Sequence, residues 1–184
     1  MKYKLFFLSI FFFLLSFQSS SEKTQNPPKT SFGMTHFGNE TLASIRSDGF
    51  LHLNGTHIID TVHINGHLEA ENAEIGNLVA NGCAHLKNSI IKGTAIIHGT
   101  IDAHNTIFQN ELSLTAEKAS FSGCTLESID VKKKALSFSS QTLEFHDHSK
   151  VKGSITFESK KGEVLLFNGS EVLGSVYGGT ILHK

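Results

Sequence analysis

Apolar and polar residues alternate in short stretches along the middle of the chain, and the alternation restarts at regular intervals. Segments aligned on a recurring glycine begin at Gly49, Gly66, Gly82 and Gly99, with a fifth at Ala116, so the successive intervals are 17, 16, 17 and 17 residues. Alternation with a period of two is the pattern of a β-strand with one buried face. Because so short a unit cannot bury its own apolar face, the repeat predicts units that stack on one another.

Each unit contains three apolar stretches separated by corners. In the first unit the stretches are centred on Leu51, Ile58 and Val62. Corners recur at Gly55-Thr56, Asn72-Ala73, Asn88-Ser89, Asn105-Thr106 and Gly123-Cys124. Asn and Gly tolerate the left-handed backbone of a sharp corner. We therefore predict an all-β fold, a single-stranded parallel β-helix (β-solenoid) with triangular coils of about 16–18 residues. An antiparallel sandwich is the alternative, but it fits the constant register less well.

The stacked corners also predict hydrogen bonds between side chains of successive coils. Asn72, Asn88 and Asn105 occupy equivalent corners, so their side chains could form a hydrogen-bonded ladder along the solenoid.

The repeat lengthens near the C-terminus. The segment 143–157 aligns with 164–178 when Ser149 is set beneath Ser170, which gives a period of 21 residues. We interpret the additional residues, around 137–141 and 159–163, as longer loops. The solenoid is then expected to run from about Thr41 to Ile181 in seven or eight coils, as one domain covering 41–184.

The N-terminal region has the pattern of an export signal. Lys2 and Lys4 precede an apolar stretch of 13 residues, 5–17, which is short for a membrane span, and Ser19–Ser21 supply small residues for cleavage. We predict a signal peptide at 1–21. The polar segment 22–40 is predicted to be a linker that could also cap the first coil through Phe32 and Phe37.

Two segments of the C-terminal repeat carry a family resemblance. They read Val151-Lys152-Gly153-Ser154-Ile155 and Val172-Leu173-Gly174-Ser175-Val176. Short coils with this cassette resemble the bactofilins, the polymer-forming bacterial cytoskeletal family. The resemblance covers the solenoid and implies a β-helix that associates end to end. The chain differs from that family, whose members are cytoplasmic, in beginning with an export signal.

Charge and cysteine content narrow the function classes. The formal net charge is −1, which does not favour nucleic acid as a partner, and membrane contact is expected only through an uncleaved signal. An exported chain could form a disulfide. The register, however, places Cys83 after a turn glycine and Cys124 in a small-residue corner more than two coils away, so we predict no bond between them.

The candidate metal ligands are mainly histidines, of which the chain contains 11. His52, Glu69, His85 and Asp102 each lie three residues after a turn position, so they are expected to stack in one outward column. Imidazole and carboxylate groups could bind a divalent cation. A solvated column that alternates histidine with acid is the alternative. His146-Asp147-His148 is a second candidate, but no third ligand lies at a fixed spacing. We predict no cofactor and assign no metal site.

Catalytic motifs are absent from the sequence. It contains no G-x-S-x-G, P-loop, G-x-G-x-x-G or C-x-x-C motif. Polysaccharide lyases and hydrolases built on β-helices carry long loops and paired carboxylates, whereas these coils are short and their acids do not cluster. Hexapeptide acyltransferases have a strict six-residue period, which this chain lacks.

We therefore predict an exported, non-enzymatic solenoid in the periplasm, at the cell surface or in the medium. Its role would be that of a structural, surface or self-assembling module, with a homo-oligomer formed through the solenoid ends. The alternative is a glycan- or cation-binding module of the cell envelope.

The signal prediction can be tested directly. When the full chain is expressed in a bacterial host, intact-mass measurement of the recovered protein should show loss of the first 19–21 residues. A chain of full mass recovered from the membrane fraction would instead identify the segment as an anchor.

Overall fold

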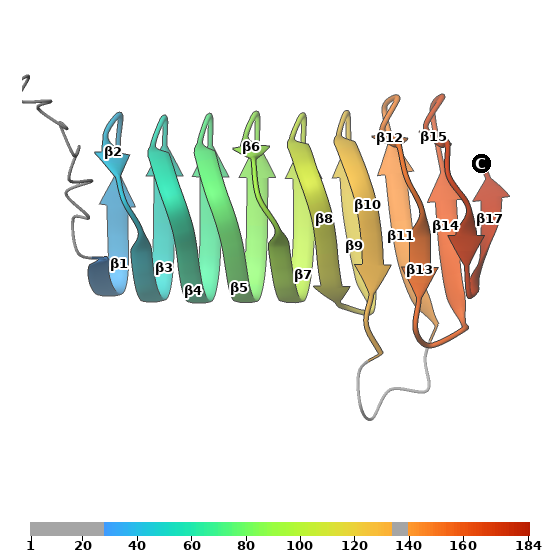
Figure 1. The fold of residues 1–184 in the computed structure, drawn as a ribbon, viewed down its shortest axis with the longest axis horizontal. Helices are drawn as coiled ribbons and strands as arrows, with labels where there is room; N and C mark the ends of the chain where they lie inside the picture. The colour runs from blue at the N-terminus through green and yellow to red at the C-terminus, as the bar shows by residue number, and fades with distance from the viewer. Residues whose placement is uncertain (1–27, 134–139) are drawn as a thin grey trace, which may run out of the picture.

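The computed structural model describes residues 28–133 and 140–184, and this part of the chain is entirely β. Its parallel strands stack as a solenoid of about 9 turns, with successive coils side by side in chain order (Figure 1). In the described residues no helix is long and apolar enough to cross a membrane. The predicted signal peptide at 1–21 lies outside the described residues.

The strands are β1 (Lys29–Phe37), β2 (Thr41–Leu42), β3 (Ile45–Asn54), β4 (His57–Glu71), β5 (Glu74–Lys87), β6 (Ile90–Ile91), β7 (Ala95–His104), β8 (Ile107–Thr115), β9 (Lys118–Ser122), β10 (Thr125–Val131), β11 (Gln141–His146), β12 (Lys150–Val151), β13 (Ile155–Phe157), β14 (Gly162–Leu166), β15 (Glu171–Val172), β16 (Val176–Tyr177) and β17 (Gly179–His183).

Each coil contributes to three parallel ladders, which confirms the predicted fold. The first ladder pairs Ile58 with Ile75, the second pairs Val62 with Leu78, and the third pairs Leu68 with Ala84. Longer strands such as β4 and β5 run through a corner and so belong to more than one ladder. Paired strand residues lie one repeat apart, so the sequence register is also the hydrogen-bond register, with register shifts between Ile58 and Thr61 and between Leu126 and Ser128.

The ladder begins earlier than the sequence repeat predicts. β1 pairs along its whole length with β3, from Lys29 opposite Ile45 to Phe37 opposite Leu53. Residues 29–37, expected in a linker or cap, are therefore strand residues of the first coil. Together with the C-terminal coils they bring the solenoid to about 9 turns, not seven or eight.

The C-terminal register follows the predicted alignment. Leu143 pairs with Val164 and Ile155 with Val176, which reproduces the 21-residue period. One expected loop, near 159–163, is a turn at 158–160. The other expected loop lies largely in 134–139, outside the described residues. The last coil shortens again, because Val164 pairs with Ile181.

Inward side chains of all three ladders form one continuous apolar column. Ile58, Val62 and Leu68 are each 0–1 % exposed, and their equivalents are buried as far as the coil of Val151, Ile155 and Val164. Aromatic residues widen the column towards the C-terminal half, where the rings of Phe121 and Phe145 stack 5.2 Å apart. Burial of one such side chain contributes about 1.5–3 kcal/mol, so stacking stabilises coils that could not fold alone.

Glycine is required where the second ladder turns into the third. Gly49, Gly66, Gly82 and Gly99 stack at this corner with φ between 126° and 141°, which is left-handed backbone. A Cβ at Gly82 would overlap the carbonyl oxygen of Gly66 in the preceding coil. Glycine is therefore needed for two reasons: the backbone is left-handed, and the stacked backbones lie too close together to leave room for a Cβ.

The predicted asparagine ladder is present at the next corner. Asn72, Asn88 and Asn105 all have φ near +50°. The Asn88 amide donates to Asn72 over 3.4 Å, and the Asn105 amide donates to Asn88 over 3.3 Å. The side chains thus continue the backbone ladder outside the coil.

Beside this ladder lies a column of small, buried polar side chains at the corner positions of Thr56, Ser89, Thr106, Cys124, Ser149 and Ser170. Their hydroxyl groups bond backbone in their own and neighbouring coils, as where Ser89 Oγ donates to Lys87 and accepts from the Ala73 N–H at 3.1 Å. Cys124 occupies the same position: its thiol lies 3.2 Å from the Ala103 carbonyl oxygen. Both cysteines are free, and burial raises the pKa of the Cys124 thiol to about 11.

Substitution of the stacked glycine tests the close-approach argument. Gly82→Ala should lower the free energy of unfolding by at least about 3 kcal/mol, because the methyl group meets backbone of the preceding coil and the left-handed φ is strained. Gly38→Ala is the matched control, since a Cβ there would meet nothing within 4 Å. Equal urea midpoints for the two variants would contradict this account.

Thiol labelling tests the buried corner. The thiolate is the reactive form of cysteine, so a pKa of about 11 keeps Cys124 unreactive at pH 8 and allows labelling only as the pH rises towards that value. One thiol per native chain, Cys83, should react with a maleimide at pH 8, and both should react in denaturant. Rapid labelling of both in the native chain would contradict the burial of Cys124.

Candidate functional site

The predicted outward column exists on the third ladder. His52 of β3 pairs with Glu69 of β4, Glu69 with His85 of β5, and His85 with Asp102 of β7. Alternation along each strand places these side chains outside, because their neighbours Leu68 and Ala84 point into the core. The sequence therefore predicts both the order and the orientation of this column.

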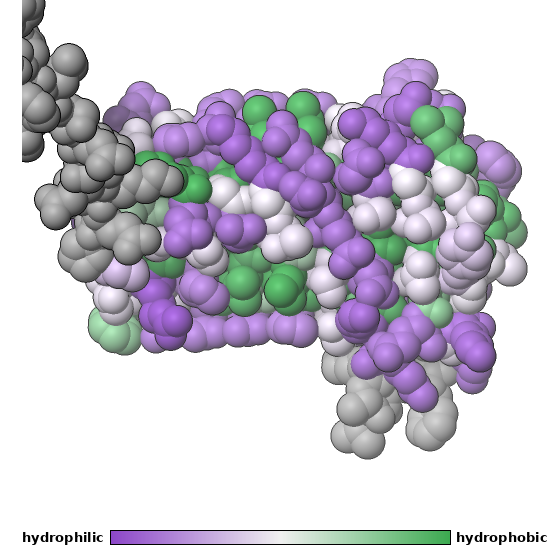
Figure 2. All heavy atoms as spheres, in the orientation of Figure 1, coloured by the Kyte–Doolittle hydropathy of each residue, from purple (hydrophilic) through white to green (hydrophobic). Residues whose placement is uncertain are grey.

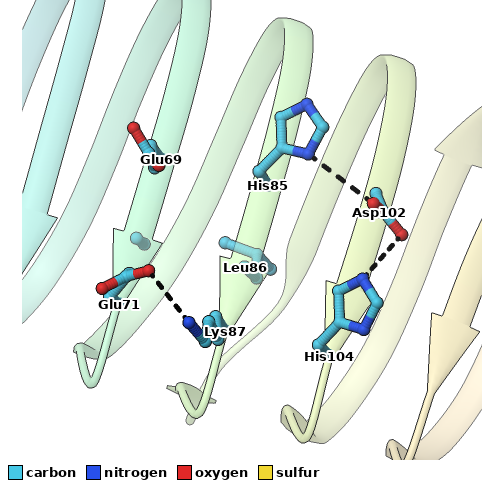
Figure 3. Close-up of a pocket in the computed structure, with 8 residues that line it drawn as sticks. Glu69, Glu71, His85, Leu86, Lys87, Asp102 and His104 are labelled. Carbon is cyan, nitrogen blue, oxygen red and sulfur yellow. Dashed lines mark hydrogen bonds and ion pairs between the residues drawn. The ribbon is translucent and has the colours of Figure 1, made fainter.

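A second column runs beside the first and completes a shallow hollow (Figure 3). It contains Asn54, Glu71, Lys87 and His104 in register. The hollow is lined by Glu69, Ala70, Glu71, His85, Leu86, Lys87, Asp102 and His104.

Three ion pairs border the hollow, and two of them, His85 with Asp102 and Lys87 with Glu71, connect neighbouring coils. Asp102 lies 3.8 Å from Nδ1 of His85 and 3.4 Å from Nε2 of His104, and Lys87 lies 3.4 Å from Glu71. Each of these side chains is between 33 % and 59 % exposed. Exposed pairs of this kind contribute about 0–1 kcal/mol each.

The four metal candidates do not converge. His52, Glu69, His85 and Asp102 lie in a line along the solenoid, one per coil, and stacked strands are about 4.8 Å apart. Within residues 28–133 and 140–184 no group of three or more His, Cys, Asp or Glu side chains could hold a metal ion. What the column does provide is alternating charge on a solvated face.

The first ladder carries a tighter ionic contact that the sequence did not reveal. Glu74 of β5 contacts Lys92 and lies 2.9 Å from Nδ1 of His57, its partner in the preceding coil. The hydrogen bond from Lys92 is the main cause that holds the pKa of Glu74 below its usual range. Three side chains from successive coils thus meet at one point, where the Lys92 ammonium balances the Glu74 carboxylate, and the contact joins coils.

The second histidine candidate has a structural role. His146 ends β11 and stacks on Phe167, with ring centres 4.4 Å apart. Asp147 accepts hydrogen bonds from Ser122 at 2.6 Å and from Asn168 at 3.2 Å, and these bonds lower its pKa. Asp147 and His148 both have left-handed backbone, as a corner requires. This motif bridges three coils at a corner.

Two polar features of the ladders were not predicted. The Asn65 amide donates to Asp48 over 2.6 Å, and the Asn81 amide donates to Asn65 over 2.7 Å. The sequence signal is the Asp or Asn that precedes Gly49, Gly66 and Gly82.

The other missed feature is a contact between His36 and His52, whose Nδ1 atoms are 3.0 Å apart. Its signal is Gly33, which lies 16 residues before Gly49, so that the segment 33–37 is one more copy of the repeat.

Comparison of the chain with protein-family models, with curated proteins and with solved structures finds no match.

Proposed function

We propose that the chain is an exported, non-catalytic structural module that associates with copies of itself through the C-terminal end of the solenoid. The observation that carries this proposal is the last coil, formed by β15, β16 and β17. These strands pair with β12, β13 and β14 on one side. Among the described residues no strand pairs with their other side.

Apolar side chains at this end are incompletely covered. Val172 and Val176 are only partly buried and Ile181 is 38 % exposed, whereas the equivalent positions one coil earlier, Val151, Ile155 and Val164, are all 0 % exposed. Leu173, Tyr177 and Leu182 are exposed in the same coil, at the C-terminal end of the solenoid. In the space-filling view hydrophobic residues reach the surface at this end (Figure 2). An added coil or a second copy would bury Val172, Val176 and Ile181, as the last coil buries Val151, Ile155 and Val164.

An open edge of this kind favours association. Unpaired N–H and C=O groups along a strand form a template for another chain. Repeat proteins commonly need a terminal unit with a polar outer face to remain soluble. The last coil instead combines free backbone groups with exposed apolar side chains, so it has the two features that drive strand addition.

At its inward positions the opposite end is more polar, while Phe32 and Met34 of β1 are exposed there. In β1 the inward positions include Ser31 and Thr35, which pair with Ser47 and Leu51. Ser31 donates a hydrogen bond of 2.8 Å to Ser47. Because hydroxyl groups at inward positions reduce the apolar area available for contact, the two ends are unequal. This asymmetry supports pairing of two C-terminal ends in a dimer over open-ended growth.

Two further points support the proposal. The export pattern at 1–21 supports a place in the periplasm, at the cell surface or in the medium. The resemblance of the two C-terminal cassettes to the bactofilins supports end-to-end association, although the present chain would assemble outside the cytoplasm.

Light scattering combined with negative-stain electron microscopy tests the assembly. The wild-type chain should give particles of at least two copies that dissociate on dilution, and Val172→Asp should give monomers, because a carboxylate at this position cannot be buried at the contact. Ile96→Asp is the control, since Ile96 is an exposed residue on the side of the solenoid and should leave assembly unchanged.

A wild-type chain that is monomeric at all concentrations would overturn the proposal. The same holds if Val172→Asp, shown to be folded by circular dichroism, has the particle size of the wild type.

A further inference from the structure

The contact between His36 and His52 has an unusual geometry. The two residues are paired in the ladder between β1 and β3, so their side chains leave the sheet next to each other. Their Nδ1 atoms are 3.0 Å apart, and the ring centres are 4.7 Å apart with the ring planes tilted by 60°. The nitrogens, and not the ring faces, are therefore directed towards one another.

Two imidazole nitrogens at this separation match the spacing of two ligands on one metal ion. A metal about 2.0–2.1 Å from each nitrogen, with an angle between a right angle and the tetrahedral angle, separates the nitrogens by about 2.8–3.4 Å. The observed 3.0 Å lies inside this interval. No backbone movement is needed, because the ladder already fixes the two Cα atoms in register.

The surroundings leave these nitrogens available. His36 is exposed and His52 is partly exposed. Within the described part of the chain neither imidazole forms an ion pair with a carboxylate, whereas His57, His85, His104 and His146 all do. A cation could thus approach from solvent without displacing an ionic partner.

We propose that His36 and His52 form a two-histidine site for a divalent transition-metal cation of the kind that imidazole binds, such as Cu²⁺ or Zn²⁺. Before binding, one neutral ring donates its Nδ1 proton in a hydrogen bond to Nδ1 of the other. On binding, both Nδ1 lone pairs coordinate the metal, and the donor ring carries its proton on Nε2. Both rings stay neutral, and water fills the remaining coordination positions.

The chemistry of the donors selects the metal. Imidazole nitrogen suits Zn²⁺, Cu²⁺ and Ni²⁺, while Ca²⁺ and Mg²⁺ prefer oxygen ligands. Ca²⁺ is therefore the control cation: its binding would indicate attraction of any divalent cation by surface charge and not coordination by imidazole. The site is also distinct from the hollow around His85, Asp102 and His104, where the histidines already face a carboxylate.

Binding would join two coils. β1 pairs with β3 and with no other described strand, so its backbone is held from one side. A metal shared by His36 and His52 adds a link between these strands outside the sheet. Because a ligand that binds only the folded state stabilises it, metal should slow amide exchange in β1 more than in the central coils.

Calorimetric titration of the purified full chain, prepared without a histidine tag, tests the site. Cu²⁺ and Zn²⁺ should bind at one site per chain, and Ca²⁺ should not bind. His36→Ala and His52→Ala should each weaken the affinity at least 10-fold, because one of two protein ligands is lost. His98→Ala, an exposed histidine of β7 that faces Thr115, is the matched control and should bind as the wild type does.

A spectroscopic measurement separates this site from binding elsewhere. The electron paramagnetic resonance spectrum of the Cu²⁺-loaded chain should show coupling to two nitrogens, reduced to one in either single variant. His85→Ala should leave both the spectrum and the affinity unchanged. Absence of Cu²⁺ and Zn²⁺ binding, or binding that is lost in His85→Ala and kept in His36→Ala, would overturn the proposal.

Discussion

Hydrogen bonding between coils is the constraint on which the rest of this structure depends. A coil contributes one strand to each of three ladders, so the backbone groups of its strands find their partners in the coils before and after it. Each residue therefore stacks on its equivalent one repeat away. Any requirement at one position, such as room for a backbone carbonyl at Gly82 or a hydroxyl group at Ser89, recurs in neighbouring coils.

The same constraint concentrates function at particular places. Side faces present columns whose charges alternate and neutralise one another, as between Glu71 and Lys87, and the hollow beside them is shallow and exposed to solvent. At the last described coil, by contrast, no described strand pairs with the outer side of β15, β16 and β17, and Val172, Val176 and Ile181 are more exposed than their equivalents. The proposed assembly at Val172 and Ile181 thus follows from the open strand edges and the partly exposed apolar side chains of this coil.

Column chemistry depends on which residues follow one another. In the column that contains His36, His52, Glu69, His85 and Asp102, His85 forms an ion pair with Asp102, whereas His36 and His52 bring two nitrogens within 3.0 Å of each other. The same holds in the corner column of small buried side chains that contains Ser89 and Cys124. The Cys124 thiol contacts backbone there as the hydroxyl groups of the column do, and burial raises its pKa, which disfavours the thiolate. Neighbouring coils, more than the residue type alone, set the chemistry of each position.

The sequence alone determined the fold, the register, the asparagine ladder and the column from His52 to Asp102, because a solenoid stacks residues that are one repeat apart. It did not determine where the ladder begins, since 29–37 departs from the apolar pattern by placing Ser31 and Thr35 at inward positions. Only the tertiary structure decided which side chains in a column touch. Contacts such as Glu74 with Lys92 and His36 with His52 depend on side-chain direction, which a repeat pattern does not specify.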